Sequence, residues 1–149
     1  MELFSVRDKV AVVTGGSRGI GLMIARGFVE AGAKVYISSR KAQVCDAVAA
    51  ELSKSGACVS LPADLGTEAG CRGLADEVAK REQQLHVLVN NAGANWGAPI
   101  DQYPDDAFDK VFALNVKGVF NLTRFLTPLL QKAASEDRKS TRLNSSHPK

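Results

Sequence analysis

A glycine-rich turn between a short apolar strand and a helix is the feature that most constrains this chain. Residues 9–21 read KVAVVTGGSRGIG, an apolar run followed by spaced glycines and the start of a helix. The first backbone N–H groups of a helix have no partner within it, and the helix dipole adds positive charge there. A pyrophosphate fits such a site. We expect a sharp turn at Gly15, close approach of phosphates at Gly19, and tight packing of helix on strand at Gly21.

The spacing of these glycines, G-x-x-x-G-x-G, differs from the G-x-G-x-x-G of the usual dinucleotide-binding turn. Because glycine-rich turns are common and mostly structural, the flanking strand and helix carry the interpretation. A Walker phosphate loop is excluded, since no Gly-Lys-Ser/Thr comes after the turn.

Apolar strands and helices alternate four times along the chain. Strands without in/out alternation are buried on both faces of a sheet and are therefore parallel. With right-handed crossovers they predict an α/β, doubly wound parallel sheet of the Rossmann type, incomplete after the fourth strand and its following helix. The expected strands lie at 10–13, 34–38, 58–61 and 87–89.

The helices are predicted from apolar spacing and caps. Val44, Val48 and Leu52 are expected on the buried face of the second helix, and Thr67 is expected to cap the third. Pro104 stands near the start of one long final helix, where a proline is tolerated.

Length, composition and charge describe an ordinary globular domain. The 149 residues are 45% hydrophobic and 23% charged. Of the net charge of +3, residues 135–149 carry +2, from four basic and two acidic side chains, so we expect no nucleic-acid-binding face. No segment has the length of a signal peptide's apolar core or a membrane span. Three scattered cysteines and two isolated histidines predict no disulfide, no metal site and a cytoplasmic location.

The end of the second strand indicates which nicotinamide cofactor would bind. An acidic residue there holds the ribose hydroxyls of NAD, whereas a cation accommodates the 2′-phosphate of NADP. The chain has Ser39-Arg40-Lys41 at this place and Arg18 inside the glycine turn. Two guanidinium groups suit a dianionic phosphate and favour NADP, although two solvated surface arginines are the simpler alternative.

Two further polar segments come after the third and fourth strands. Asp64-Leu65 can meet an adenine, with the carboxylate accepting from its amino group, but an aspartate that only forms a turn is an equal alternative. The run 90–93, NNAG, is either an ordinary turn or a place where small residues leave room for a cofactor. Gly15 and Asn91 are expected at the carboxyl edges of adjacent strands.

Asn115 is the most informative residue of the last helix. It falls on an apolar stripe formed by Phe108, Val111, Phe112, Val119 and Leu122. A buried amide without partners costs about 1–3 kcal/mol. The side chain is therefore either satisfied by neighbouring backbone or directed into an active site.

Four motifs together resemble the classical short-chain dehydrogenase/reductase family. They are TGGSRGIG (14–21), Asp64-Leu65, NNAG (90–93) and LNVKG (114–118), in the family's order and spacing over residues 6–133. The arginines make the chain most similar to the NADP-dependent 3-oxoacyl-carrier-protein reductases. The family transfers a hydride between the nicotinamide and a carbonyl or alcohol, and its members commonly form homo-oligomers.

The resemblance also implies roles for particular residues. Asn115 would be the asparagine of the catalytic tetrad. The implied cofactor contacts are Gly15, Ser17, Arg18, Gly19, Ile20, Gly21, Ser39, Arg40, Asp64, Leu65, Asn91, Ala92 and Gly93.

The chain departs from the family after residue 134. The family's catalytic tyrosine is followed four residues later by a lysine, but Tyr36 is followed by Arg40 and Tyr103 by Ala107. Residues 135–149, SEDRKSTRLNSSHPK, hold one apolar residue and cannot form a buried fifth strand. We therefore expect a truncated cofactor-binding domain at 1–134 and a polar, disordered or non-native segment at 135–149, inactive as it stands. The alternatives are a non-catalytic NADP-binding module and a product without function.

Overall fold

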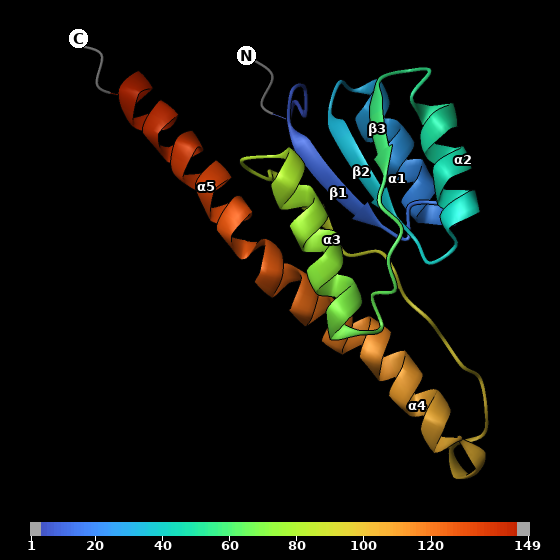
Figure 1. The fold of residues 1–149 in the computed structure, drawn as a ribbon. Coiled ribbons are helices and arrows are strands. Elements are labelled where there is room, and N and C mark those ends of the chain that lie inside the picture. The colour runs from blue at the N-terminus through green and yellow to red at the C-terminus, as the bar shows by residue number, and fades with distance from the viewer. Residues whose placement is uncertain (1–3, 146–149) are drawn as a thin grey trace.

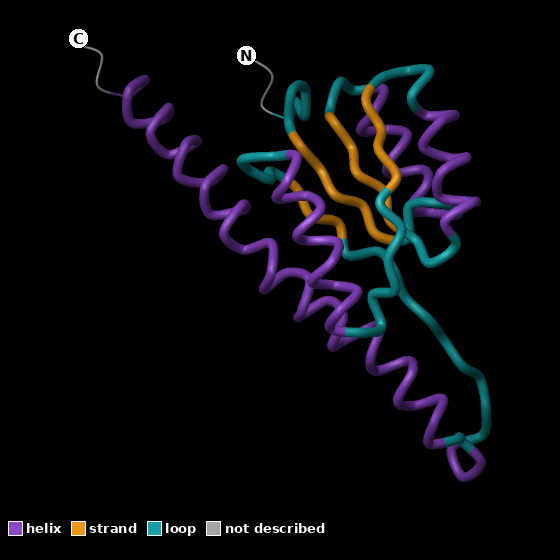
Figure 2. The backbone as a smooth tube through the Cα atoms, in the orientation of Figure 1, coloured by secondary structure: helices purple, strands orange, loops and turns teal. Residues whose placement is uncertain are grey.

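The computed structural model describes residues 4–145, with side chains through residue 138. Its centre is a four-stranded parallel sheet in the order β3-β2-β1-β4 (Figures 1 and 2). All four predicted strands are confirmed, within one residue at each end. They are β1 (Val10–Thr14), β2 (Lys34–Ser38), β3 (Ala57–Ser60) and β4 (Val87–Val89).

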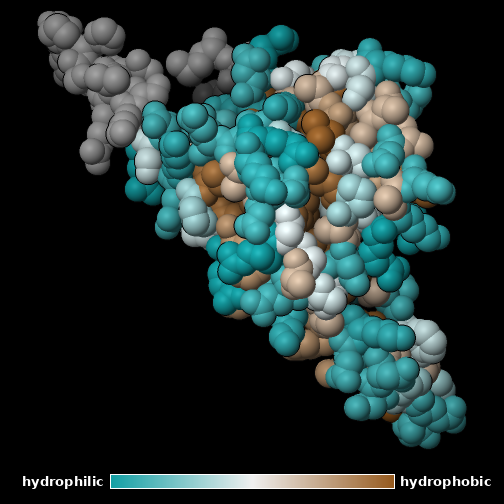
Figure 3. Space-filling model, viewed as in Figure 1, coloured by the Kyte–Doolittle hydropathy of each residue, from teal (hydrophilic) through white to brown (hydrophobic). Residues whose placement is uncertain are grey.

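Helices cover both faces of the sheet, which makes the fold doubly wound as predicted (Figure 1). One face packs on α1 (Gly19–Glu30) and α2 (Ala42–Leu52), and the other on α3 (Glu68–Arg81) and α5 (Val119–Ser145). Each face has its own apolar cluster, because successive strand residues point to opposite sides. On the side drawn in Figure 3, hydrophilic residues cover most of the surface.

The strand order places a switch point between β1 and β4. Strand β1 pairs with β2 on one side and with β4 on the other, so the chain changes direction across the sheet after β3. Val13 is the register partner of both Ile37 and Val89. The loops that leave β1 and β4 therefore begin at the same edge of the sheet, which is where ligands bind in folds of this kind.

The final helix is more elaborate than the single helix predicted. It consists of α4 (Asp105–Phe112), a π-helical segment η2 (Ala113–Gly118) and α5, after a 3₁₀ turn η1 (Ile100–Gln102). Pro104 directly precedes α4 in extended conformation. In Figure 1 this rod runs alongside α3, and α4 projects beyond the end of α3. A Cβ atom at Gly118 would overlap the carbonyl oxygen of Leu65, so glycine allows the rod to lie against the β3–α3 loop.

The predicted buried face of α2 is confirmed at Leu52 and is wrong at Val44 and Val48. Cys45, Ala49 and Leu52 are buried, whereas Val44 is 45% exposed and Val48 only partly buried. The small side chains of Cys45 and Ala49 let α2 lie close to the sheet, and the two valines turn toward the groove beside α1.

The segment after residue 134 continues the last helix. Its backbone is helical through Ser145, where the sequence predicted disorder, and residues 146–149 lie outside the described part. Asp137 is 3.7 Å from the Lys9 ammonium group. That residues 135–149 are a non-native segment stays a prediction. Between residues 4 and 145 no helix is both long and apolar enough to cross a bilayer.

Candidate functional site

The glycine turn after β1 has the geometry predicted for it. Gly15 and Gly19 adopt φ angles of +63° and +56°, which residues with a side chain rarely adopt. The N–H groups of Gly15 and Gly16 donate to the carbonyl of Ser38 (2.9 and 3.3 Å), which anchors the turn to β2. A Cβ at Gly21 would overlap the carbonyl oxygen of Gly15, whereas one at Gly19 would meet no atom within 4 Å. The close packing is confirmed, and phosphate binding at the open side stays a prediction.

The amino end of α1 is left open to an anion. Arg18 occupies the N-cap position without a capping hydrogen bond from its side chain, and the first turn holds no acidic residue. By contrast, Thr67 caps α3 by accepting a hydrogen bond from the Gly70 N–H (3.0 Å), and Glu68 stands in that helix's first turn. The free N–H groups and the dipole of α1 therefore face the carboxyl edge uncompensated.

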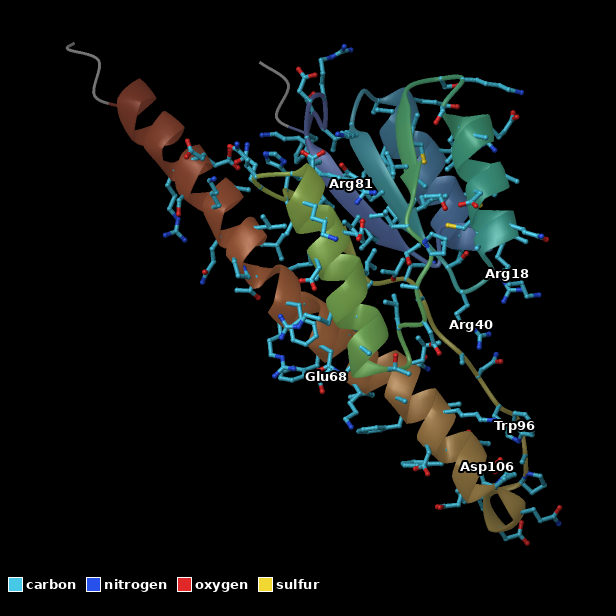
Figure 4. The ribbon with its side chains drawn as sticks, viewed as in Figure 1. Arg18, Arg40, Glu68, Arg81, Trp96 and Asp106 are labelled. Atoms are coloured by element: carbon cyan, nitrogen blue, oxygen red, sulfur yellow. The ribbon has the colours of Figure 1, made fainter. Side chains whose placement is uncertain are left out.

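Unpaired polar groups gather beside this helix end. The side chains of Arg18 and Arg40 are exposed and make no hydrogen bond or ion pair within the described residues, and Figure 4 draws both beyond the carboxyl ends of β1 and β2. The hydroxyl oxygens of Ser38 and Ser39 are buried and have no hydrogen-bond partner in the part of the chain that the structure describes. A buried hydroxyl left unpaired costs about 1–3 kcal/mol, so this edge has polar capacity for water or a ligand.

Thr14 fixes the loop after β4 to the end of β1. Its buried hydroxyl donates to the Val89 carbonyl (3.3 Å) and accepts from the N–H groups of Asn91 (3.0 Å) and Ala92 (2.9 Å). The Asn91 amide nitrogen also donates to the Gly15 carbonyl (3.3 Å). The predicted juxtaposition of Gly15 and Asn91 is thereby confirmed.

Asn115 lies in η2 and is satisfied by backbone. Its Oδ1 accepts from the Ala94 N–H (2.8 Å) and its Nδ2 donates to the Ala94 carbonyl (2.7 Å). The residue is exposed, so the prediction that it falls on a buried stripe is wrong. Phe108 and Phe112 are also exposed, at 57% and 46%, because α4 projects past the sheet, whereas Leu122 is fully buried.

The residues after β3 have a smaller part at this edge. The exposed carboxylate of Asp64 accepts from the Gly66 N–H (3.0 Å), which is the turn-forming alternative for this aspartate. The side chain of Leu65 is buried in the core, so any ligand contact would come from its backbone. Gly93 keeps space beside Asn115, whose Oδ1 would lie 3.3 Å from a Cβ there.

Three residues of the site were not predicted from the sequence. The hydrogen bonds of the Thr14 hydroxyl to the loop after β4 form what we call the clamp. Ala94 is the partner of Asn115, and Gly118 leaves room for the β3–α3 loop. A signal existed for Thr14, since a polar residue that ends a buried strand must find partners for its hydroxyl. No such signal marks Ala94, because its backbone alone takes part.

Two hollows of the molecule lie away from the carboxyl edge. A hollow of about 450 Å³ lies between α1 and α2, and one of about 520 Å³ lies at the amino ends of the strands near Arg7 and Gly56. Neither reaches the glycine turn. Trp96 is 57% exposed on the loop before α4 (Figure 4).

Comparison with known proteins explains this arrangement. A family model described as short chain dehydrogenase matches residues 9–138. The chain belongs to the short-chain dehydrogenase family. The resemblance seen in the sequence motifs is thus confirmed.

Individual family members resemble the chain closely. The rhamnolipids biosynthesis 3-oxoacyl-[acyl-carrier-protein] reductase of Pseudomonas aeruginosa is 47% identical over 141 residues, covering 95% of this chain and 55% of that protein. The solved Pseudomonas aeruginosa RhlG/NADP active-site complex has a TM-score of 0.83 at 48% identity, covering 86% of this chain and 50% of its own. The L-sorbose reductase of Gluconobacter frateurii, complexed with NADPH and L-sorbose, has the same TM-score at 30% identity, covering 87% and 50%. The chain spans about half the length of these relatives.

Proposed function

We propose that this chain is the cofactor-binding half of an NADP(H)-dependent oxidoreductase acting on a small carbonyl or alcohol substrate. The observation that carries the proposal is the uncapped amino end of α1 with Arg18 and Arg40 unpaired beside it. When bound, the cofactor supplies or accepts a hydride at its nicotinamide. The similar solved structures include complexes with NADP and NADPH, which supports this choice of cofactor.

Different residues of the carboxyl edge would bind different parts of the dinucleotide. The N–H groups of Gly19, Ile20 and Gly21 would receive the pyrophosphate. Arg40 and Arg18 would bind the 2′-phosphate, because guanidinium groups form paired hydrogen bonds with phosphate oxygens. Ser39 fits this role as well, since its buried hydroxyl has no partner among the described residues.

Asn115 would act by positioning. Both polar atoms of its side chain bind Ala94, so it holds the far end of the loop that Thr14 holds at the near end. The loop from Asn91 to Gly93 is then fixed at two points, which limits its freedom where a cofactor would lie. The family's tyrosine–lysine pair has no counterpart in these 149 residues, so we propose that the chain alone binds the cofactor without turnover.

Assembly and location complete the proposal. Phe108, Phe112, Val116 and Phe120 recur every fourth residue along α4, η2 and α5, and each is 46–61% exposed. An apolar stripe of this kind suits burial against a further chain or domain, and a homo-oligomer of the whole protein is proposed. The three free cysteines suit a cytoplasmic location.

The assignment is tested by measuring the affinities for NADPH and NADH in the wild type and in Arg40→Asp. A charged hydrogen bond contributes about 1.5–3 kcal/mol, so the substitution should lower the preference for NADPH by about tenfold or more. Arg26→Asp is the matched control, because Arg26 is an exposed arginine on α1 that lines the α1–α2 groove instead.

An unchanged ratio of NADPH to NADH affinity in Arg40→Asp would contradict the assignment of NADP as the cofactor. Folded protein that binds neither cofactor would point to a product without function. Tight NADPH binding with no turnover, even with a full-length partner present, would favour a non-catalytic binding module.

A further inference from the structure

His86 joins the amino ends of β1 and β4 by two hydrogen bonds. Its backbone N–H donates to the Val10 carbonyl (3.0 Å), and the Val10 N–H donates in turn to the Nδ1 atom of the imidazole (3.0 Å). The ring nitrogen thus stands in for the backbone carbonyl that would otherwise continue the ladder. The regular pairing begins one residue later, with Ala11 opposite Val87.

This second bond requires one protonation state of the ring. A neutral imidazole accepts at one nitrogen only, so Nδ1 must carry no proton and the proton must sit on Nε2. A protonated imidazole has N–H donors at both positions. Protonation would therefore set the Nδ1–H group against the Val10 N–H and abolish the bond.

Strand β4 depends strongly on its attachments. It has three residues, and within residues 4–145 it pairs with β1 alone and forms one edge of the sheet. Thr14 holds its carboxyl end and the loop beyond it, while His86 holds its amino end. Because short edge strands have few ladder bonds, each end attachment is a substantial share of what keeps β4 in place.

We propose that His86 is a pH-sensitive latch that holds the amino end of β4 on β1 when its ring is neutral and loosens it when the ring is protonated. The name latch refers to the hydrogen bond from the Val10 N–H to Nδ1 of His86, which protonation abolishes while the backbone bond to the Val10 carbonyl remains. The consequence for the cofactor loop after β4 rests on the proposed function, whereas the latch itself does not.

Charged groups from three elements face the ring. Lys9 precedes β1, Asp137 comes from α5, and Glu82 ends α3, where Lys34 also binds it. Burial lowers the pKa of His86 and Lys9 lowers it further, whereas Asp137 and Glu82 act in the opposite direction; the net change in pKa is downward.

The sign of the pH effect is set by this direction. The folded protein binds the proton on His86 less readily than the unfolded chain, whose ordinary histidine pKa is about 6.5. The latch therefore contributes its full stability above that pKa, and the contribution is lost as the pH falls through the lower folded pKa.

The test compares urea unfolding of the wild type and His86→Asn at a series of pH values from 7.5 to 5.0. The Oδ1 atom of asparagine lies at the same number of bonds from the backbone as Nδ1, accepts a hydrogen bond and does not titrate. The wild-type unfolding constant should rise about fivefold more than that of His86→Asn over this range, the equivalent of one hydrogen bond. Acidic groups titrate in both proteins and cancel in the comparison.

Equal pH profiles in the two proteins would overturn the proposal. A second measurement needs no variant to fold: the ring nitrogen chemical shifts of wild-type His86 should show an unprotonated Nδ1 at pH 7.5, and a protonated Nδ1 would also overturn it. NADPH affinity is measured in parallel and should fall with pH in the wild type more than in His86→Asn. Absence of NADPH binding at every pH would count against the proposed function and leave the latch standing.

Discussion

The two edges of the sheet differ in how their polar side chains are paired. At the carboxyl edge, no partner among the described residues is found for the side chains of Arg18, Arg40 and Ser39. At the amino edge, the carboxylate of Glu82 binds both Lys34 and Tyr36. Buried or half-buried polar groups normally find partners when a chain folds. An edge that leaves several unsatisfied gives up stability that a ligand can restore. The contrast between the two edges therefore supports the proposal that a ligand binds at the carboxyl edge.

The amino edge is paired at close distances. The Tyr36 hydroxyl and the Lys34 ammonium group each lie 2.6 Å from the same oxygen of Glu82. Burial raises the pKa of Glu82, but the bonds from Lys34 and Tyr36 outweigh it and the net change is downward. Gln84 is the exception at this edge, since its side-chain oxygen is buried without a partner.

The largest predicted effect is at the glycine turn. Gly21→Ala should destabilise the protein by about 3 kcal/mol, because the new methyl group would overlap the backbone of Gly15, which cannot move aside. Gly27→Ala, in the same helix with open space around it, is the control and should stabilise by about 0.5–1 kcal/mol. Chemical unfolding measures both. Equal effects of the two substitutions would contradict the close packing of α1 on the turn.

A smaller loss is expected at the clamp that fixes the cofactor loop. Thr14→Val keeps the shape of the side chain but leaves the N–H groups of Asn91 and Ala92 without their acceptor, at a cost of about 2 kcal/mol. Thr14→Ser keeps the hydroxyl and should recover most of this loss. Unfolding free energies and NADPH affinities of both variants are the measurements. Equal unfolding free energies of the valine and serine variants would show that the clamp does not stabilise the protein.

The smallest effects test the two edges against each other. Tyr36→Phe removes a satisfied hydroxyl at the amino edge and should cost about 1 kcal/mol. Ser39→Ala removes an unsatisfied hydroxyl at the carboxyl edge and should cost nothing without ligand while weakening NADPH binding. Thermal unfolding with and without NADPH separates the two outcomes. A loss of stability in ligand-free Ser39→Ala would remove the contrast between the edges.

The strands and the glycine turn were predictable because local sequence determines them. Continuous apolar runs such as 10–13 have one stable environment, a sheet covered on both faces, and glycines at φ > 0 mark the turn that comes next. The relation of Gly15 to Asn91 was also predictable, since the carboxyl ends of parallel strands share an edge. Parallel strand order then placed the candidate site.

The remainder depends on how helices sit in space, which spacing alone does not reveal. Spacing selected Val44 and Val48 for the buried face of α2, but the small side chains of Cys45 and Ala49 allow a closer approach and occupy that face instead. Spacing also put Asn115 on a buried stripe, but the residue is exposed, and α4, which precedes it, extends past the sheet. The partner of Asn115 is the backbone of Ala94, and a contact made by backbone alone cannot be predicted from the type of residue.

The clamp made by Thr14 also sets an order of assembly. Its three hydrogen bonds join residues 75, 77 and 78 positions apart, whereas β1 and β2 are separated by a single helix. Contacts between distant residues form late, because closing a long loop costs entropy before the contact contributes. During synthesis β1, β2 and β3 can pair while the ribosome has yet to release Asn91. We therefore expect the glycine turn to form before the loop after β4 packs on it. The carboxyl edge of a nascent chain would then be completed in one late step.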